Sequence, residues 1–330
     1  YDDEGELASA TLVTSGGGYV TVNAGSDIAN HKVDGLSLYG GTLDFGLMTE
    51  GSESGQIVVG SDGFATNASK TVVKVALGEN NNATGSDVFD LNSDLSVLLI
   101  KGFNASGRDL DSLDFSGSAE VDQLVKQSGR YADGSATAEL TYSSGHLVGD
   151  ESGISAAWDL SKINLLAGNE EGFRIDASAE TGQSGTISAL ITGEGSIEFA
   201  GGTITLNHAN NTYTGNTYVT DGKLELDADE ALGDSALLAV TGSGAVSVGE
   251  TDQSIGSISV AGENGLSMDA DGSLTLTSGA STISSANNGV SGTVALSGKG
   301  TTLTIQNASG VGGDDTTISL GDDTSVIFAG

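Results

Sequence analysis

The sequence predicts an all-β protein that folds as a parallel β-helix, a solenoid whose successive coils stack on one another. Three observations predict this class. Short runs with an apolar residue at every second position recur along the 330 residues, and this is the period of a β-strand. The chain has 51 glycines and no proline, which suits a backbone whose N–H groups enter strand ladders. The expected number of strands, about twenty, is larger than one β-sandwich contains. The self-similarity of the C-terminal half favours a solenoid instead.

The expected strands follow one another at short intervals. Those of the first eighty residues are Val20–Val22, Leu36–Leu38, Leu43–Phe45, Ile57–Val59 and Val72–Val75. From Ala236 onward a strand is expected every eight to twelve residues or so. These are Leu238–Val240, Val246–Val248, Ile258–Val260, Leu266–Met268, Leu274–Leu276, Val294–Leu296, Leu303–Ile305, Ile318–Leu320 and Val326–Phe328.

The segment Asn80–Gly134 breaks this rhythm, because it is polar at its start and alternates only weakly. Within it, Val121, Leu124 and Val125 stand at i, i+3 and i+4, the spacing of a short amphipathic helix. The pattern therefore predicts loops and a short helix that project from the solenoid. Strand spacing resumes at Ala138–Tyr142, and the single tryptophan, Trp158, is expected to fill the core or its rim.

The most regular stretch is Gly193–Leu226, where short alternating runs are separated by Gly-Gly, Asn-Asn and Asp-Gly turns. These turn pairs supply the positive φ angles that tight reversals need. The alternation places Ile204 and Leu224 inside the coil and Thr205 and Glu225 outside it. A buried charge at an inward position should therefore open the stack, while an outward change should be nearly neutral.

The same stretch resembles a known pattern, the autotransporter-associated β-strand repeat, over Gly193–Gly233. The matched positions are Asn211, Tyr213, Gly215, Thr217, Val219, Gly222, Leu224 and Leu226, followed by Ala231-Leu232-Gly233. The resemblance implies a passenger domain of a bacterial type V autotransporter, of the self-associating adhesin family. It also implies a right-handed parallel β-helix with projecting loops and ~22 residues per coil, so residues 1–330 should form one segment of about 15 coils.

The function implied by this resemblance is that of a non-enzymatic adhesin exported through the outer membrane to the bacterial surface. Self-association in biofilms and attachment to host matrix or cells are both roles of such virulence-linked passengers. The alternative is a β-helical scaffold that carries a hydrolase or toxin. The absence of cysteine agrees with a passenger that crosses the periplasm unfolded. Because Tyr1 is not preceded by a basic or apolar leader, the chain is expected to be a processed segment.

The net charge of the chain excludes some classes of binding partner. Eleven Lys and Arg against 45 Asp and Glu give a net charge of −34. Such a field repels nucleic acid and anionic membranes and keeps an edge-rich β protein soluble. No run of eighteen or so apolar residues exists that could span a membrane as a helix. A Ca²⁺-binding surface is the second interpretation, since Asp227–Glu230 and Asp269–Gly272 place alternate carboxylates, although neither completes an EF-hand loop.

Signals for catalysis, metals and cofactors are poor, and none of these is predicted. Gly233–Ala236 contains a Gly-Asp-Ser, but alanine follows where the serine proteases have glycine, so Ser235 is expected to be a turn residue. The three histidines, His31, His146 and His208, are scattered, and there is no thiol. No HExxH and no phosphate-binding loop occurs. A transition-metal site is therefore not expected.

The predicted interaction surface combines a polar ladder with scattered cations. Its members are Thr203, Thr205, Thr217, Thr220, Lys101, Arg108, Lys126 and Arg130. The threonines are predicted to hydrogen-bond a second copy or a glycan. The cations, with Lys70 and Lys74, are predicted to relieve the repulsion between two acidic copies. The expected partners are an identical passenger on a neighbouring cell, or a host extracellular-matrix protein or glycan.

Overall fold

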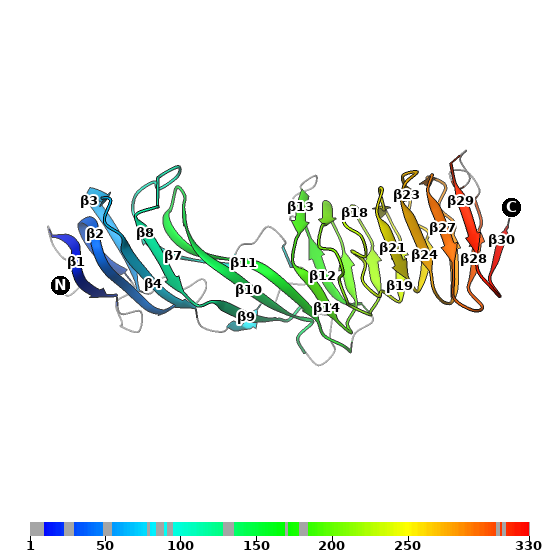
Figure 1. Ribbon diagram of the computed structural model, residues 1–330. Helices are drawn as coiled ribbons and strands as arrows, with labels where there is room; N and C mark the ends of the chain where they lie inside the picture. Colours follow the sequence, from blue (N-terminus) through cyan, green and yellow to red (C-terminus); the bar gives the residue numbers. More distant parts are fainter. Residues whose placement is uncertain are drawn as a thin grey trace. The chain divides into compact units, whose positions relative to one another are not determined.

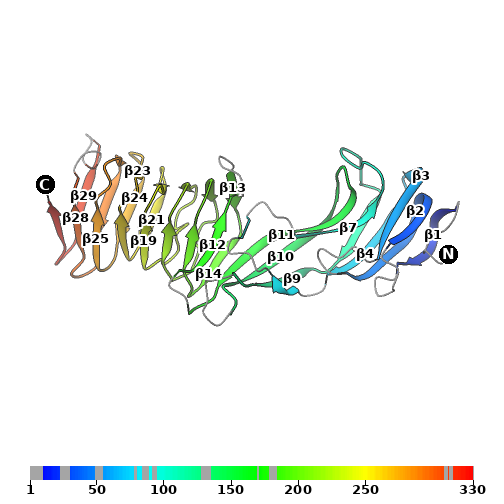
Figure 2. The same ribbon diagram turned by 180° about the vertical axis from the view of Figure 1, so that it is seen from behind.

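The fold is an all-β parallel β-solenoid of about 11 turns, as the sequence predicts (Figures 1 and 2). A computed structural model describes residues 10–22, 30–48, 55–77, 80–83, 89–90, 95–127, 135–168, 171–177, 184–307, 311 and 315–329. None of these described residues is helical, and so none belongs to a helix long and apolar enough to cross a membrane.

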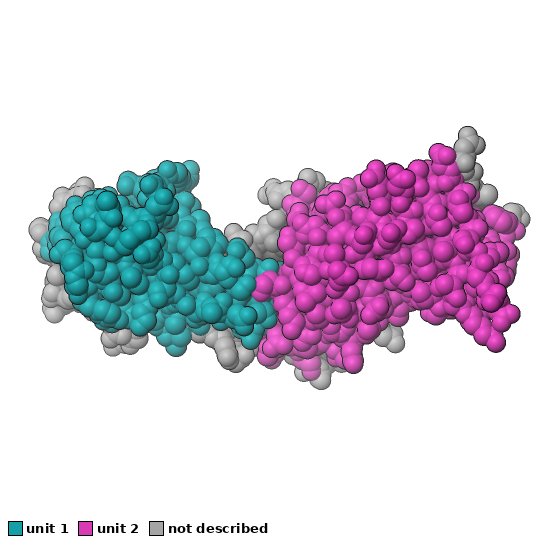
Figure 3. All heavy atoms as spheres, in the orientation of Figure 1, with its two compact units in different colours: residues 1–81, 94–123, 141–160 teal, residues 82–93, 124–140, 161–330 magenta. Residues whose placement is uncertain are grey.

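The chain divides into two compact units, which are described separately (Figure 3). Unit 1 comprises residues 1–81, 94–123 and 141–160, and unit 2 comprises residues 82–93, 124–140 and 161–330. Strands β9 (Glu120–Val125), β10 (Ala138–Gly149) and β11 (Gly153–Leu165) contribute residues to both.

Unit 1 is built on long parallel strands. β2 (Asn30–Met48) pairs with β1 (Thr11–Thr21), with β3 (Gln56–Thr66) and with β4 (Thr71–Leu77). β8 (Leu113–Gly117) extends the set beside β4, and β7 (Leu95–Lys101) lies beside β3. β7 then pairs antiparallel with β11. An antiparallel pair cannot belong to a simple helical coil, so these residues add strands without adding turns. The prediction of about 15 coils was therefore too high.

The helix predicted at Val121–Val125 is wrong. These residues form β9, in which Val121, Gln123 and Val125 are buried and Leu124 is half-exposed. The buried positions follow a period of two, because pairing with neighbouring strands outweighs the helical spacing of three apolar side chains. The predicted projection at 80–134 is also only partly right, since β5 (Asn80–Ala83), β6 (Phe89–Asp90), β7, β8 and β9 all enter sheets. Residues 84–88, 91–94 and 128–134 lie outside the described part of this segment.

Unit 2 stacks short strands into three parallel sheets. Sheet I follows β6 with β12 (Phe173–Asp176), β15 (Ile197–Phe199), β17 (Thr217–Val219), β19 (Leu237–Val240), β22 (Ser257–Val260), β25 (Ala280–Ile283), β28 (Thr302–Ile305) and β30 (Ser325–Phe328). Sheet II contains β13 (Ser184–Ile187), β16 (Thr203–Leu206), β18 (Lys223–Leu226), β20 (Ala245–Ser247), β23 (Gly265–Met268) and β26 (Gly289–Val290). Sheet III contains β21 (Asp252–Ile255), β24 (Ser273–Leu276), β27 (Thr293–Leu296) and β29 (Thr317–Leu320). β14 (Leu190–Gly193) pairs with β11.

The core of unit 2 is a column of aliphatic side chains in register from coil to coil. In sheet II, Ile204 pairs with Leu224, Leu224 with Val246, and Val246 with Leu266. All four are buried, whereas Thr205 and Glu225 are half-exposed, so the predicted strand phase is confirmed. The offsets of 20 and 22 residues between Ile204, Leu224 and Val246 also agree with the expected coil length.

Trp158 fills the core of unit 1, as predicted. Its side chain is 2% exposed and meets the Phe115 ring edge to face, with centroids 5.6 Å apart. Its Nε1 donates a hydrogen bond to the carbonyl of Ser118 at 3.0 Å. The indole thereby buries a large apolar surface while its one polar group remains satisfied.

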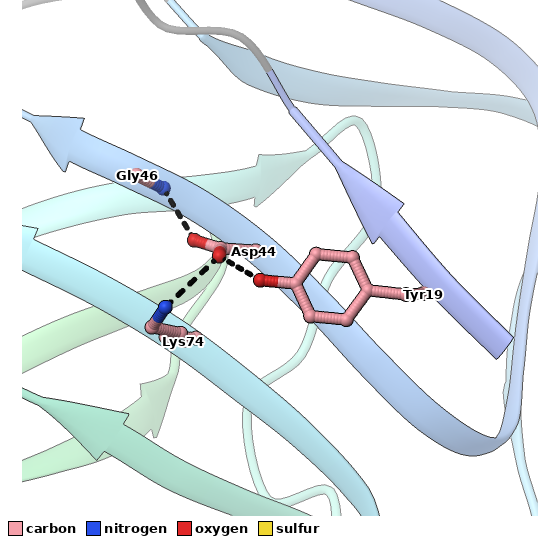
Figure 4. Close-up of polar contacts among 4 residues, drawn as sticks. All are labelled: Tyr19, Asp44, Gly46 and Lys74. Carbon is pink, nitrogen blue, oxygen red and sulfur yellow. Dashed lines mark hydrogen bonds and ion pairs between the residues drawn. The ribbon is translucent and has the colours of Figure 1, made fainter. Parts of the chain in front are cut away.

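A polar cluster joins β1, β2 and β4 of unit 1 (Figure 4). Asp44 on β2 accepts a hydrogen bond from the Tyr19 hydroxyl and another from the Gly46 amide at 2.9 Å. The Lys74 ammonium lies 3.2 Å from the same carboxylate. The Tyr19 hydrogen bond is the largest of the effects that hold the pKa of Asp44 below its ordinary value. The contacts that join these three strands are therefore strongest while the Asp44 carboxylate is ionised.

This cluster predicts acid-sensitive stability of unit 1. Because its pKa is lowered on folding, Asp44 contributes stability that is present above about pH 4 and lost as pH falls through its folded-state pKa. Asp44→Asn should destabilise the protein at pH 7 and should weaken the acid dependence of unfolding. Urea unfolding between pH 2 and pH 7 measures both effects. Unchanged acid dependence in the variant would show that other carboxylates control it.

Candidate functional site: polar side chains within and on the coils

Asn211, the first matched residue of the repeat, links three successive coils. Its amide oxygen accepts a hydrogen bond from the Ile191 amide at 2.8 Å. Its amide nitrogen donates to the carbonyl of Ala231 at 2.7 Å and, more weakly, to that of His208 at 3.3 Å. The side chain is buried. Asn211 thus satisfies backbone groups one coil before and one coil after its own, which only an amide with both donor and acceptor can do.

Tyr213, Thr217 and Ser235 form a second buried polar chain in the same coils. The Tyr213 hydroxyl lies 2.7 Å from the Thr217 hydroxyl, which lies 3.0 Å from that of Ser235. Ser235 also hydrogen-bonds the carbonyl of Gly215 at 3.0 Å. Burial raises the pKa of the Tyr213 phenol, so the hydroxyl stays neutral.

Two consequences follow for the predicted site residues. Thr217 is fully buried, so its place in the predicted surface ladder is wrong. It stands in register with Ile197 and Leu238, which are core positions, and a hydroxyl is tolerated there because Tyr213 and Ser235 satisfy it. Ser235 is also buried, with its hydroxyl bonded within the core. No substrate can reach it there, so the interpretation of Gly233–Ala236 as a structural turn stands.

The repeat's glycines allow the coils to approach each other closely. A Cβ atom at Gly215 would overlap the carbonyl oxygen of Gly195 in the preceding coil. Gly222 has a φ of +69°, and a Cβ there would overlap the carbonyl oxygen of Gly202. Both positions therefore exclude any larger residue. The matched residues of the repeat hold the coils together rather than forming a surface.

In later coils, other buried side-chain amides hydrogen-bond the backbone of a neighbouring coil, as Asn211 does. Gln253 is buried, accepts a hydrogen bond from the Leu232 amide at 3.2 Å and donates to the carbonyl of Ala228 at 2.8 Å. Asn288 accepts from the Leu266 amide at 3.1 Å. Neither residue was predicted from the sequence, because neither occupies a matched position of the repeat. A polar residue at an inward position of a strand or its flanking turn is the signal that could have identified them.

Three of the four predicted surface threonines do lie on the outside of unit 2. Thr203 and Thr205 are half-exposed on β16, and Thr205 donates a long hydrogen bond of 3.5 Å to Glu225 on the next coil. Thr220 is half-exposed and donates to Glu198 at 2.7 Å. Thr203 and Thr205 share sheet II, whereas Thr220 follows β17 of sheet I. The structure therefore divides the predicted ladder between two faces.

The predicted cations are similarly dispersed. Lys101 is half-exposed at the end of β7, and Arg108 is exposed in the turn that follows. The Arg108 guanidinium lies 5.3 Å from the centroid of the Phe103 ring, which stacks on Phe64 at 4.8 Å. Lys126 is exposed and belongs to unit 2. Arg130 lies outside the described residues, and Lys70 and Lys74 pair with Asp114 and Asp44.

The acidic turns of unit 2 bind their own backbone. Asp229 accepts a hydrogen bond from the Asp252 amide at 2.9 Å, and Glu230 accepts one from the Ser254 amide at 3.1 Å. Burial, followed by the neighbouring Asp234, raises the pKa of Glu230. Within the described ranges, no group of three or more His, Asp or Glu side chains is arranged to hold a metal ion.

Outward hydroxyls on sheet I were not identified from the sequence. Ser259, Thr282 and Thr304 stand side by side on β22, β25 and β28. All three are half-exposed. These three residues become neighbours only because of the number of residues in each coil. This number varies by a few residues from coil to coil, and the sequence alone does not specify it.

Comparison with known proteins yields one distant similarity. No family model matches the chain, and no solved structure matches it. The chain is similar to a protein of Escherichia coli strain K12 described as the uncharacterized protein YuaQ, with 27% identity over 294 residues. The match covers 84% of this chain and 21% of YuaQ, so the chain spans about a fifth of that relative's length. The description of this relative names no activity, substrate or partner.

Proposed function

We propose that the chain is a segment of a non-enzymatic adhesin on the bacterial surface, exported as an autotransporter passenger. The observation that carries the proposal is the role of the repeat. Asn211 and Thr217, two of its matched residues, connect successive coils through buried hydrogen bonds. A repeat whose matched residues hold successive coils together is suited to building a stack of coils. A partner would then be bound by the outward side chains, which the repeat does not specify.

Binding by such a stack would rest on repetition. Neighbouring strands lie about 4.8 Å apart, so an outward polar side chain recurs at that spacing from coil to coil. Contacts that are individually weak add up when many engage one partner together. The buried, bonded hydroxyl of Ser235 removes the one serine whose sequence context suggested a hydrolase nucleophile.

Display of the whole segment on non-aggregating bacterial cells tests the proposal. We expect cells that carry it to settle faster, or to bind immobilised matrix proteins, relative to cells that display an unrelated β-protein. The dependence on salt concentration distinguishes self-association from binding to a basic partner. Self-association between copies of net charge −34 should strengthen as salt screens their repulsion. A basic partner held by carboxylates should instead be released. If the displaying cells show no faster settling and no matrix binding at any salt concentration, the proposal is contradicted.

The cations are better tested by point substitution than by deletion of residues 80–134. Deletion would remove β7 and β8 from the sheet of unit 1. Arg108→Ala and Lys126→Ala change exposed side chains and should leave the fold intact. If these cations mediate contact between acidic copies, the double variant should settle more slowly at low salt than the parent. Equal settling would remove both from the predicted interaction surface.

A further inference from the structure

The chain contains two Asn-Gly pairs, Asn264-Gly265 and Asn288-Gly289, and both lie where the chain passes from sheet I to sheet II. In each pair the asparagine ends the turn and the glycine begins a strand, β23 or β26. An asparagine side chain is most open to attack by the following backbone nitrogen when that residue is glycine, because no Cβ obstructs the approach. The two pairs share this local sequence and lie on neighbouring strands, so they can be compared directly.

The Asn264 side chain is exposed and is held by a single hydrogen bond. Its nitrogen donates to the carbonyl of Ser243, an exposed turn residue of the preceding coil, at 2.9 Å. Its oxygen has no partner among the described residues. In the same part of the chain, no side chain and no carbonyl outside the strand ladders accepts a hydrogen bond from the Gly265 amide. Breaking one exposed contact therefore frees the Asn264 side chain to approach the Gly265 nitrogen.

The Asn288 side chain is buried and is held at both of its polar atoms. It is 9% exposed, and its oxygen accepts a hydrogen bond from the Leu266 amide at 3.1 Å. Its nitrogen donates to the carbonyl of Ser285 at 2.7 Å. To reach the Gly289 nitrogen, this side chain must break both hydrogen bonds and leave the Leu266 amide without a partner. Local opening of the coil must therefore precede any reaction at Asn288.

The fold requires the glycine that makes Asn264 reactive. Gly265 has a φ of +67°, a conformation in which any residue with a side chain is strained. A Cβ at this position would also lie 2.6 Å from the side-chain oxygen of Asn288 in the next coil. At Gly289, by contrast, the nearest atom to a Cβ would be 3.9 Å away. The exposed pair therefore cannot lose its glycine without damage to the stack.

We infer that Asn264 is a site of spontaneous covalent modification in which water is the only co-reactant. The Gly265 nitrogen loses its proton to solvent base and attacks Cγ of Asn264, and the new C–N bond closes a succinimide ring. The bond from Cγ to Nδ2 breaks, and the side-chain nitrogen takes a proton from solvent and leaves as ammonia. Water then opens the ring at one of its two carbonyls. One opening gives aspartate, and the other gives isoaspartate, in which the backbone runs through Cγ.

The modification removes a contact between successive coils. Along this edge, the Ser243 hydroxyl donates to Asp221, Asn264 donates to the carbonyl of Ser243, and Asn287 donates to the carbonyl of Glu263 at 2.6 Å. A carboxylate at position 264 cannot donate the middle hydrogen bond. Isoaspartate also lengthens the backbone just before β23. The modified chain should therefore unfold at a lower urea concentration, and this inference is independent of the proposed adhesin function.

Incubation of the whole segment in mildly alkaline buffer, followed by peptide mass spectrometry, tests the inference. Deamidation at Asn264 should be at least about tenfold faster than at Asn288, because Asn288 reacts only after local opening. It should also be faster than at Asn67 and Asn104, which are exposed but are followed by alanine. The rate should rise with pH, because the attacking nitrogen must lose a proton. Asn264→Gln should abolish the reaction at this position, since the longer side chain would have to close a larger ring.

Unfolding provides the second control. In concentrated urea, Asn264 and Asn288 should deamidate at similar rates, because both are followed by glycine and neither is protected. Asn264→Asp reproduces one product and should unfold at a lower urea concentration than the parent, whereas Asn207→Asp, at an exposed position, should not. Equal rates at Asn264 and Asn288 in the folded protein, or no reaction at Asn264, would overturn the inference. Unchanged stability of Asn264→Asp would overturn the expected weakening of the stack.

Discussion

Asn211→Ala should lower the free energy of unfolding by about 2–6 kcal/mol. The change leaves the buried amide of Ile191 and the buried carbonyl of Ala231 without partners, each at a cost of about 1–3 kcal/mol. Water cannot replace the lost amide without entering the stack. Because a solenoid is stabilised by contacts between neighbouring coils, the damage should spread to both sides of Asn211. Urea unfolding followed by circular dichroism measures the loss.

Asn207→Ala provides the control for this result. Asn207 lies four residues away and is exposed, and its backbone amide donates a hydrogen bond to the carbonyl of Ile187. Its side chain forms no hydrogen bond with any residue that the structure describes. Its replacement should change the free energy of unfolding by less than about 0.5 kcal/mol. Similar losses at both positions would show that Asn211 has no special role between the coils.

Leu224→Asp should have the second large effect, a loss of at least about 4 kcal/mol. Leu224 is fully buried in register with Ile204 and Val246, so a carboxylate there has neither water nor a partner. The stack should open at this coil before it unfolds elsewhere. Limited proteolysis with mass spectrometry would detect new cleavage near Leu224, and urea unfolding would give the overall loss.

Thr203→Asp is the matched control for the inward position. Thr203 is half-exposed on the neighbouring strand and stands in register with Lys223. An aspartate there would face water and a lysine, so its effect should lie within about 0.5 kcal/mol of zero. Equal damage from Thr203→Asp and Leu224→Asp would mean that the inward and outward faces of sheet II are assigned wrongly.

The fold of unit 2 was largely predictable because each coil is local in sequence. Runs such as Ile204–Leu206 and Leu224–Leu226 alternate strictly, and the turns between them are marked by glycine, asparagine and aspartate. One coil occupies only 20 to 23 residues or so, so strand phase and coil spacing can both be inferred from a short window. The expected strands of this unit are all present.

The candidate surface was less predictable than the strands. Thr217 and Thr220 look alike in sequence, yet Thr217 is buried beside Tyr213 and Thr220 faces Glu198 on the outside. The row of Ser259, Thr282 and Thr304 combines residues 23 and 22 positions apart. Which outward side chains become neighbours depends on the length of each turn, and turns tolerate insertions of a residue or two.

The sequence by itself determined the all-β solenoid class, the acidic surface and the inward face of the strands of unit 2. These properties depend on composition and on a period of two, both of which are local. Only the tertiary structure decided that β9 is a strand, that β7 and β11 run antiparallel, and that the repeat's polar residues lie between coils. The physical reason is that strand partners and buried hydrogen bonds join residues from separate parts of the chain, and alternation within a strand carries no information about its partner.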